Sequence, residues 1–124
     1  MAAMDPRNPA DWIALNLLPG LGPATLLRLV EQRGNPADVA YRLPVAELAR
    51  SGRGRPPDVA ALAGARRGLE RRAEREALRC KRSEIQVICW DAPDYPEPLR
   101  EIAVPPLVLY VRGRLTPGLL RVGV

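Results

Sequence analysis

Hydrophobic residues recur at steps of three and four positions between residue 10 and about residue 82, the spacing of helices that bury one face. In the first such segment, Trp12, Leu15 and Leu18 follow this spacing, and Asp11 can cap or start the helix. The next segment, Pro23 to Arg33, carries Leu26, Leu27, Leu29 and Val30 as its apolar members. The pattern therefore predicts that the N-terminal part of the chain is all helical.

Local start and stop signals divide the rest of this region. Gly34 ends the second helix, and Asn35 and Pro36 are an N-cap and a first helical residue for a short helix over 35–41. A further helix is predicted over 44–50. Residues 51–57 are rich in Gly, Pro and Arg and form a loop by composition.

A long helix is predicted from residue 58 to residue 82. Its apolar face is formed by Leu62, Ala65, Leu69, Ala73 and Ala77. On the other side, Arg67, Arg71, Arg75 and Arg79 recur at every fourth residue, with Arg82 beside them. We expect this arginine stripe either to follow a phosphate backbone or to be a solvated helix face, with Arg66–Glu70 and Arg72–Glu76 as i,i+4 ion pairs.

After residue 82 the pattern changes to short β-branched runs. Strands are predicted over 85–90, 107–111 and 120–124, with a turn-rich segment at 91–98 and a single helical turn within 96–102. Continuous apolar strands are typical of a parallel α/β sheet buried on both faces. Because the last strand stops in mid-run, we expect the chain to be the front part of a larger α/β protein, truncated there. Residues 1–82 and 83–124 are the two predicted domains.

The segment between the first two helices, Leu18-Pro19-Gly20-Leu21-Gly22-Pro23, matches a helix-hairpin-helix. Gly20 is expected to be the left-handed stop of the first helix, and Pro23 suits the first turn of the second. A hairpin of this kind can direct glycine N–H groups and a helix N-terminus at a phosphate. The candidate DNA-contacting residues here are Gly20, Gly22, Ala24, Thr25 and Arg28. An ordinary tight turn between packed helices is the alternative.

The same glycines imitate a dinucleotide-binding fingerprint. That fingerprint needs a preceding strand and Gly or Ala at its sixth position, whereas a helix precedes this loop and the sixth position is Thr25. A nucleotide-binding loop is therefore rejected.

Net charge supports a polyanionic partner. The chain carries a formal charge of +5, and residues 50–82 hold eleven basic and four acidic side chains, or +7, which leaves −2 for the remainder. Eighteen of the nineteen basic residues are Arg, so part of this charge reflects the codon bias of a GC-rich genome. Trp12, Trp90 and Tyr110 are expected to be packed rather than exposed for base stacking.

The sequence lacks the residues that several kinds of metal site and catalytic site require. The 124-residue chain has no His, and Cys80 and Cys89 have no metal-ligand spacing, so neither a zinc site nor a histidine-dependent nucleophile can be assembled from it. The two cysteines fit buried positions in a reducing cytosol. No signal peptide or membrane span is apparent, so we expect a cytoplasmic location, no catalysis and no cofactor.

The order of these features, together with one block of motifs, resembles a known family. The block comprises Asp94-Tyr95-Pro96, Leu99-Arg100-Glu101-Ile102, Pro105-Pro106, Leu109-Tyr110-Val111-Arg112-Gly113 and Val122-Gly123-Val124. From about Trp12 to Val124 the chain resembles the N-terminal portion of the DNA-processing protein A family (DprA, also called Smf). The helical half is the less specific part of the match.

The resemblance implies a SAM-like helical domain followed by the first strands of a Rossmann-like domain. It implies a cytosolic, non-enzymatic protein that binds single-stranded DNA during natural transformation and helps load the RecA recombinase. A homodimer is implied for the full-length protein. The family's principal DNA-binding loop, Gly-Ser-Arg, would follow Val124 and is not in this chain.

Two other classes of function remain open. The helical part could be a protein-interaction module that docks a regulator or recombinase, with little DNA binding of its own. An enzyme would have to use the carboxylates of Asp91, Asp94, Glu97 and Glu101, but nothing in the sequence pairs them with a base, a metal set or a phosphate loop.

Overall fold

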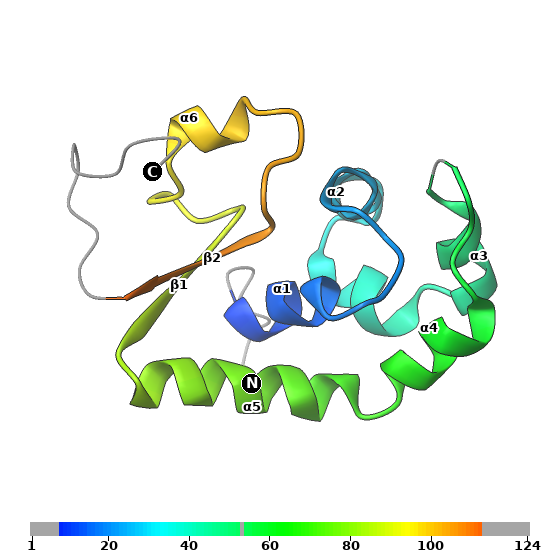
Figure 1. The fold of residues 1–124 in the computed structure, drawn as a ribbon, viewed down its shortest axis with the longest axis horizontal. Coiled ribbons are helices and arrows are strands. Elements are labelled where there is room, and N and C mark those ends of the chain that lie inside the picture. The colour runs from blue at the N-terminus through cyan, green and yellow to red at the C-terminus, as the bar shows by residue number, and fades with distance from the viewer. Residues whose placement is uncertain (1–7, 53, 113–124) are drawn as a thin grey trace.

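The computed structural model describes residues 8–52 and 54–112, and these residues are mostly helical with a small sheet at the C-terminal end (Figure 1). The elements in chain order are α1 (Pro9–Asn16), α2 (Pro23–Arg33), the π-helix η1 (Asp38–Arg42), α3 (Val45–Arg50), α4 (Val59–Arg66), α5 (Leu69–Arg82), β1 (Ile85–Cys89), α6 (Glu97–Arg100) and β2 (Val108–Arg112). Within these ranges, no helix has the length and apolar character to cross a membrane. The strand predicted over 120–124 lies outside the described residues.

Capping side chains fix where some of the helices begin, whereas α2, α3, α5 and α6 have no side-chain cap. The N–H of Ala10 donates to Asn8 Oδ1 at 3.1 Å, so Asn8 caps α1 and the prediction of Asp11 as the cap was wrong. The N–H of Asp38 donates to Asn35 Oδ1 at 2.8 Å, which confirms Asn35 as a cap. Gly34, at φ +93°, ends α2 as predicted.

The first interhelix turn departs from the expectation. Gly20 is left-handed, at φ +78°, but α1 already ends at Asn16 and Leu17 is its C-cap. Gly20 therefore belongs to the turn that leads toward α2 rather than to the end of α1.

The predicted long helix over 58–82 is two helices. Gly68 adopts a left-handed conformation at φ +65°, and Arg67 is extended, which ends α4 and starts α5. Tertiary contacts of the neighbouring Arg66 favour the break. Its guanidinium donates to the carbonyl oxygens of Ala40 (3.0 Å) and Val39 (3.1 Å) within η1 and to that of Leu43, the residue that follows η1.

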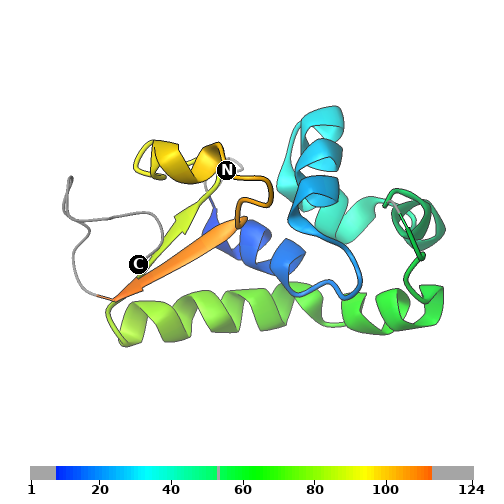
Figure 2. The same ribbon diagram turned by 45° about the horizontal axis from the view of Figure 1, so that its top comes forward.

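The two strands pair antiparallel, not parallel as predicted. Ile85 faces Arg112 and Cys89 faces Val108 across the sheet. A parallel pair needs a crossover, usually a helix that spans the sheet, whereas α6 has four residues and the chain simply reverses. Figures 1 and 2 place α6 on one face of the sheet and α5 on the other.

One hydrophobic core runs from the helices into the sheet. Trp12 is 1% exposed, and the apolar residues of α1 pack with Leu62, Leu69 and Ala73 and also with Cys89 and Val108. Cys80 and Cys89 are both buried free thiols, as expected, and burial raises the pKa of Cys89 to about 12. The division into domains at residue 82 stays a prediction.

Candidate nucleic-acid interface

The hairpin between α1 and α2 presents a helix N-terminus without a side-chain cap. Gly22 is the N-cap of α2, its carbonyl accepts from the N–H of Leu26 at 3.1 Å, and Pro23 has no N–H to satisfy. The N–H groups of Ala24 and Thr25 have no acceptor among the described residues. These two groups can therefore receive an anion.

The loop over residues 51–57 packs against the same hairpin. A Cβ atom on Gly20 would lie 2.5 Å from the Cβ of Pro57. One on Gly52 would lie 3.8 Å from Thr25 Oγ1. The Arg28 guanidinium donates to the carbonyl oxygen of Ser51. Of the predicted hairpin residues, Gly20 and Arg28 contact the loop and the Thr25 side chain lies beside it, whereas Gly22 and Ala24 are exposed.

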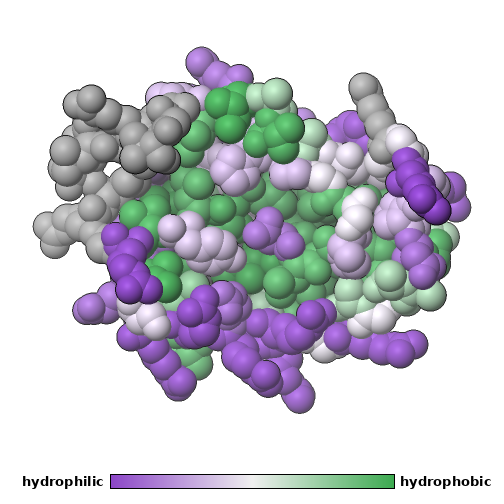
Figure 3. All heavy atoms as spheres, in the orientation of Figure 1, coloured by the Kyte–Doolittle hydropathy of each residue, from purple (hydrophilic) through white to green (hydrophobic). Residues whose placement is uncertain are grey.

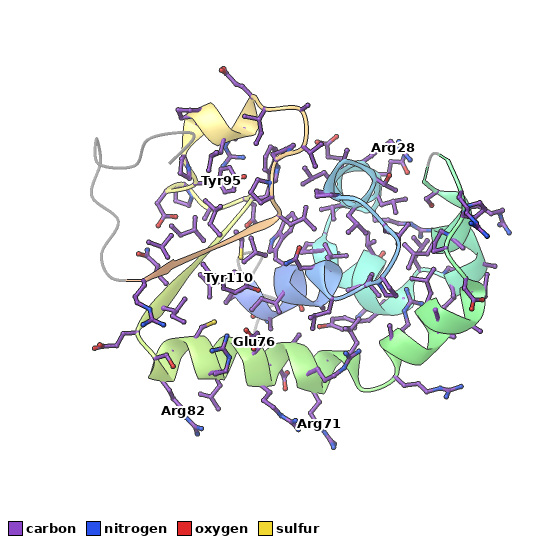
Figure 4. All side chains as sticks on the ribbon, in the orientation of Figure 1. Arg28, Arg71, Glu76, Arg82, Tyr95 and Tyr110 are labelled. Carbon is purple, nitrogen blue, oxygen red and sulfur yellow. The ribbon has the colours of Figure 1, made fainter. Side chains whose placement is uncertain are left out.

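The second predicted surface lies on α5, and part of it is confirmed as a stripe. Arg71, Arg75 and Arg82 are exposed, and none of them forms a hydrogen bond or ion pair with a described residue. Figure 4 shows Arg71 and Arg82 pointing away from the body of the protein, and Figure 3 shows hydrophilic side chains gathered along this lower edge. We call these three residues the arginine ridge.

Two members of the predicted stripe are placed differently. Arg67 lies in the connection between α4 and α5, because the helix breaks there. Arg79 is paired with Glu76 through two hydrogen bonds of 2.6 and 3.0 Å, and this pairing lowers the pKa of Glu76.

The ion pairs predicted as the alternative to a DNA contact do not form. Arg66 caps η1 instead of pairing with Glu70, and Arg72 donates to the carbonyl oxygen of Ala65 instead of pairing with Glu76. These two arginines are not part of the ridge, whose own members Arg71, Arg75 and Arg82 are exposed and have no carboxylate partner among the described residues.

The flank of α5 that faces the start of α1 is acidic. The pKa of Asp11 is raised by partial burial and by the carboxylates of Glu70 and Glu74. Burial and the same carboxylates raise the pKa of Tyr41, whose buried hydroxyl has no hydrogen-bond partner among the described residues. Because this flank repels anions, a nucleic acid on α5 is directed to the ridge and the opposite flank.

The opposite flank carries a residue that the sequence analysis missed. Tyr110 of β2 is 43% exposed, whereas it was predicted to be packed. It shares one face of the sheet with Val108, which is buried, because successive strand residues alternate between the two faces. Figure 4 shows Tyr110 and Glu76 on the same side of α5, opposite Arg71 and Arg82.

The motif block behind the family resemblance has a clear structural role. The Tyr95 hydroxyl donates to the carbonyl oxygen of Pro106 at 2.8 Å. The Arg100 guanidinium carbon lies 4.7 Å from the ring centroids of both Trp90 and Tyr95, and these rings meet edge to face. These contacts fasten α6 to the sheet.

Two of the four carboxylates considered for catalysis, those of Asp94 and Glu97, have local partners. Gln86 Nε2 donates to Asp94 Oδ2 at 3.3 Å, and Glu97 forms a 3.3 Å ion pair with Arg100. Within residues 8–52 and 54–112, no group of three or more ligand side chains could hold a metal ion.

Two surfaces therefore carry the candidate contacts. Figures 1 and 2 both place α1 between α2 and α5, so the hairpin and the arginine ridge lie on different sides of α1. Comparison with protein-family models, with curated proteins and with solved structures gives no match for this chain.

Proposed function

We propose that this chain is the N-terminal part of a single-stranded-DNA-binding protein that processes incoming DNA in natural transformation and helps load a RecA-type recombinase. The observation that carries the DNA contact is the arginine ridge of Arg71, Arg75 and Arg82, which is exposed and has no carboxylate partner within residues 8–52 and 54–112. The resemblance to the DprA family supports the physiological role. The proposed architecture is a SAM-like helical part followed by a Rossmann-like part that begins with the antiparallel pair of β1 and β2.

The ridge suits a polyanion because its charges lie in a row. At 1.5 Å per residue, Arg71 and Arg82 are separated by about 16 Å along α5, enough to contact several phosphates of one strand. Contacts of this kind give affinity through counterion release and carry no sequence preference.

The ridge is tested by charge removal with a matched control. The ridge variant carries Arg71→Gln, Arg75→Gln and Arg82→Gln. The control carries Arg33→Gln, Arg42→Gln and Arg50→Gln, which removes the same formal charge from α2, η1 and α3 and also removes the ion pairs of Arg33 with Glu47 and of Arg42 with Asp38. Fluorescence anisotropy with a labelled single-stranded oligonucleotide should show a loss of affinity of tenfold or more in the ridge variant and less than threefold in the control. Equal losses of affinity in the two variants would show that net charge alone accounts for binding, which would contradict a contact at the ridge.

The start of α2 is a second proposed contact. The free N–H groups of Ala24 and Thr25 and the positive end of the helix dipole favour a phosphate there. Gly22 has no neighbour within 4 Å of an added Cβ, so Gly22→Val fits the fold while it blocks the approach. Weaker DNA binding at unchanged helix content supports the contact, and unchanged affinity contradicts it.

A protein-interaction module is the second candidate function, and one observation favours it. A shallow, mostly apolar groove of about 410 Å³ lies beside the ridge, lined by Pro9, Ala77, Leu78, Lys81, Ile85 and Val87. Leu78 is 46% exposed there. The ridge variant separates the two functions, because a recombinase docked in this groove should bind that variant like the wild type, whereas an oligonucleotide should bind it more weakly.

A further inference from the structure

We propose that Tyr110 is a base-stacking residue, so that the surface beside α5 takes single-stranded nucleic acid in preference to duplex. The inference rests on the proposed function, because the ridge supplies the phosphate contacts. It adds a residue that receives the bases.

Tyr110 is set apart from the other aromatic residues. The chain contains two Trp and three Tyr and no Phe, and all five lie within the described residues. Trp12 and Tyr95 are buried, Tyr41 is partly buried against the core, and Trp90 is partly buried with Arg100 over its ring. Tyr110 alone among the five is exposed.

The register of the sheet fixes where the ring lies. Tyr110 pairs with Val87 of β1 and lies near Glu76 and Cys80 of α5, with the Asn16 side chain beside its hydroxyl. The pairing with β1 fixes the backbone position of Tyr110, so only its side-chain torsions have to be ordered when a base stacks on the ring.

The charge around Tyr110 allows a strand of nucleic acid to approach the ring. Glu76 lies near Tyr110, and an unpaired carboxylate there would repel a phosphate. The Arg79 guanidinium, however, donates hydrogen bonds to both carboxylate oxygens of Glu76, so the pair contributes no net charge. On the helical wheel of α5, Arg75, which has no carboxylate partner among the described residues, lies between the outward-pointing Arg71 and the side that carries Glu76. Positive charge therefore extends from the ridge toward Tyr110, whereas the acidic flank lies on the far side of α5.

Stacking on an exposed ring selects single strands. In a duplex the faces of the bases are covered by their neighbours, so the ring would gain nothing, while any base of a single strand offers a free face. The expected preference is therefore for unpaired over paired nucleic acid, with tolerance of sequence.

The test uses Tyr110→Leu, which keeps an apolar side chain, and Tyr110→Phe, which keeps the ring. Binding of oligo(dT), of an abasic strand of the same length and of a duplex is measured for both variants, the wild type and the ridge variant. Tyr110→Leu should bind oligo(dT) about tenfold more weakly and the abasic strand unchanged, and Tyr110→Phe should bind both like the wild type. Circular dichroism checks that each variant folds.

The outcomes separate the two proposals. If Tyr110→Leu binds oligo(dT) like the wild type while the ridge variant does not, stacking is overturned and the proposed function stands. If the wild type binds oligo(dT) no better than the abasic strand, stacking is overturned even without a variant. If the wild type binds no DNA, the proposed function fails and the inference fails with it.

Discussion

Gly20 lies so close to Pro57 that a Cβ atom added to Gly20 would be 2.5 Å from the Cβ of Pro57. Real side chains do not approach so closely, and Gly20 also has φ +78°, a conformation that disfavours other residues. Gly20→Ala should therefore lower the free energy of unfolding by about 2 kcal/mol or more, measured by urea denaturation.

Gly64 is the control for that substitution. It lies within α4, is exposed, and has no neighbour within 4 Å of an added Cβ. Gly64→Ala should raise the free energy of unfolding by about 0.5–1 kcal/mol, because alanine loses less conformational freedom in a helix. If Gly20→Ala were as well tolerated as Gly64→Ala, the packing of the 51–57 loop on the hairpin would be wrong.

Arg66 and Arg67 are neighbours, but we expect their replacement by alanine to reduce stability by very different amounts. Arg66 donates to three backbone carbonyls around the end of η1, and its partial burial lowers the pKa of its guanidinium. Arg66→Ala leaves those carbonyls without a charged donor and should cost about 2–3 kcal/mol of stability. Arg67→Ala removes no contact with a described residue and should cost less than about 0.5 kcal/mol. Thermal unfolding of the two variants side by side checks this, and equal melting temperatures would contradict the capping role.

Asp11 should reduce stability at neutral pH. Its pKa in the folded protein is raised, first by burial and then by Glu70 and Glu74. The folded state therefore binds the proton more tightly than the unfolded state, and stability falls as pH rises from the unfolded pKa through the folded pKa. Asp11→Asn should raise stability at pH 7 by a few tenths of a kcal/mol, since solvent screens a partly exposed carboxylate.

The pH dependence provides the check. Urea denaturation of wild type and Asp11→Asn should give a difference at pH 7 that disappears near pH 3, where Asp11 is protonated in both states. A variant that is less stable than the wild type at pH 7 would show that the helix dipole of α1 outweighs the repulsion.

Tyr95 contributes a hydrogen bond and a ring that can be removed separately. Tyr95→Phe loses the bond to the Pro106 carbonyl but keeps the ring beside Arg100, and should cost about 1 kcal/mol. Tyr95→Leu also loses the ring contacts with Arg100 and Trp90 and should cost more. Denaturant midpoints rank the two variants, and the reverse order would contradict the cluster.

What the sequence could predict depended on local chemistry. The Asn35 cap, the Gly34 stop and the single turn of α6 follow from the residues at each helix end, and all three are confirmed. The break at Gly68 was missed because the apolar spacing of the two helices continues across it, although a glycine inside a helical pattern is a local signal for such a break.

The predictions for the sheet and for Tyr110 were wrong for a similar reason. An apolar run does not specify the direction of its partner strand, so the parallel pairing was a wrong inference from composition. The exposure of Tyr110 depends on how far the helices extend over the sheet. They cover Val108 but not Tyr110 two residues further along, and no local signal encodes that limit.

The most direct test of a DNA contact on the arginine ridge is the salt dependence of single-strand binding. Each phosphate contact contributes about 0.7 to the slope of log affinity against log salt concentration, so removal of three arginines should lower the slope by about 2. We expect that change in the ridge variant and a much smaller one in the variant of Arg33, Arg42 and Arg50. Identical slopes for the ridge variant and the wild type would contradict the account.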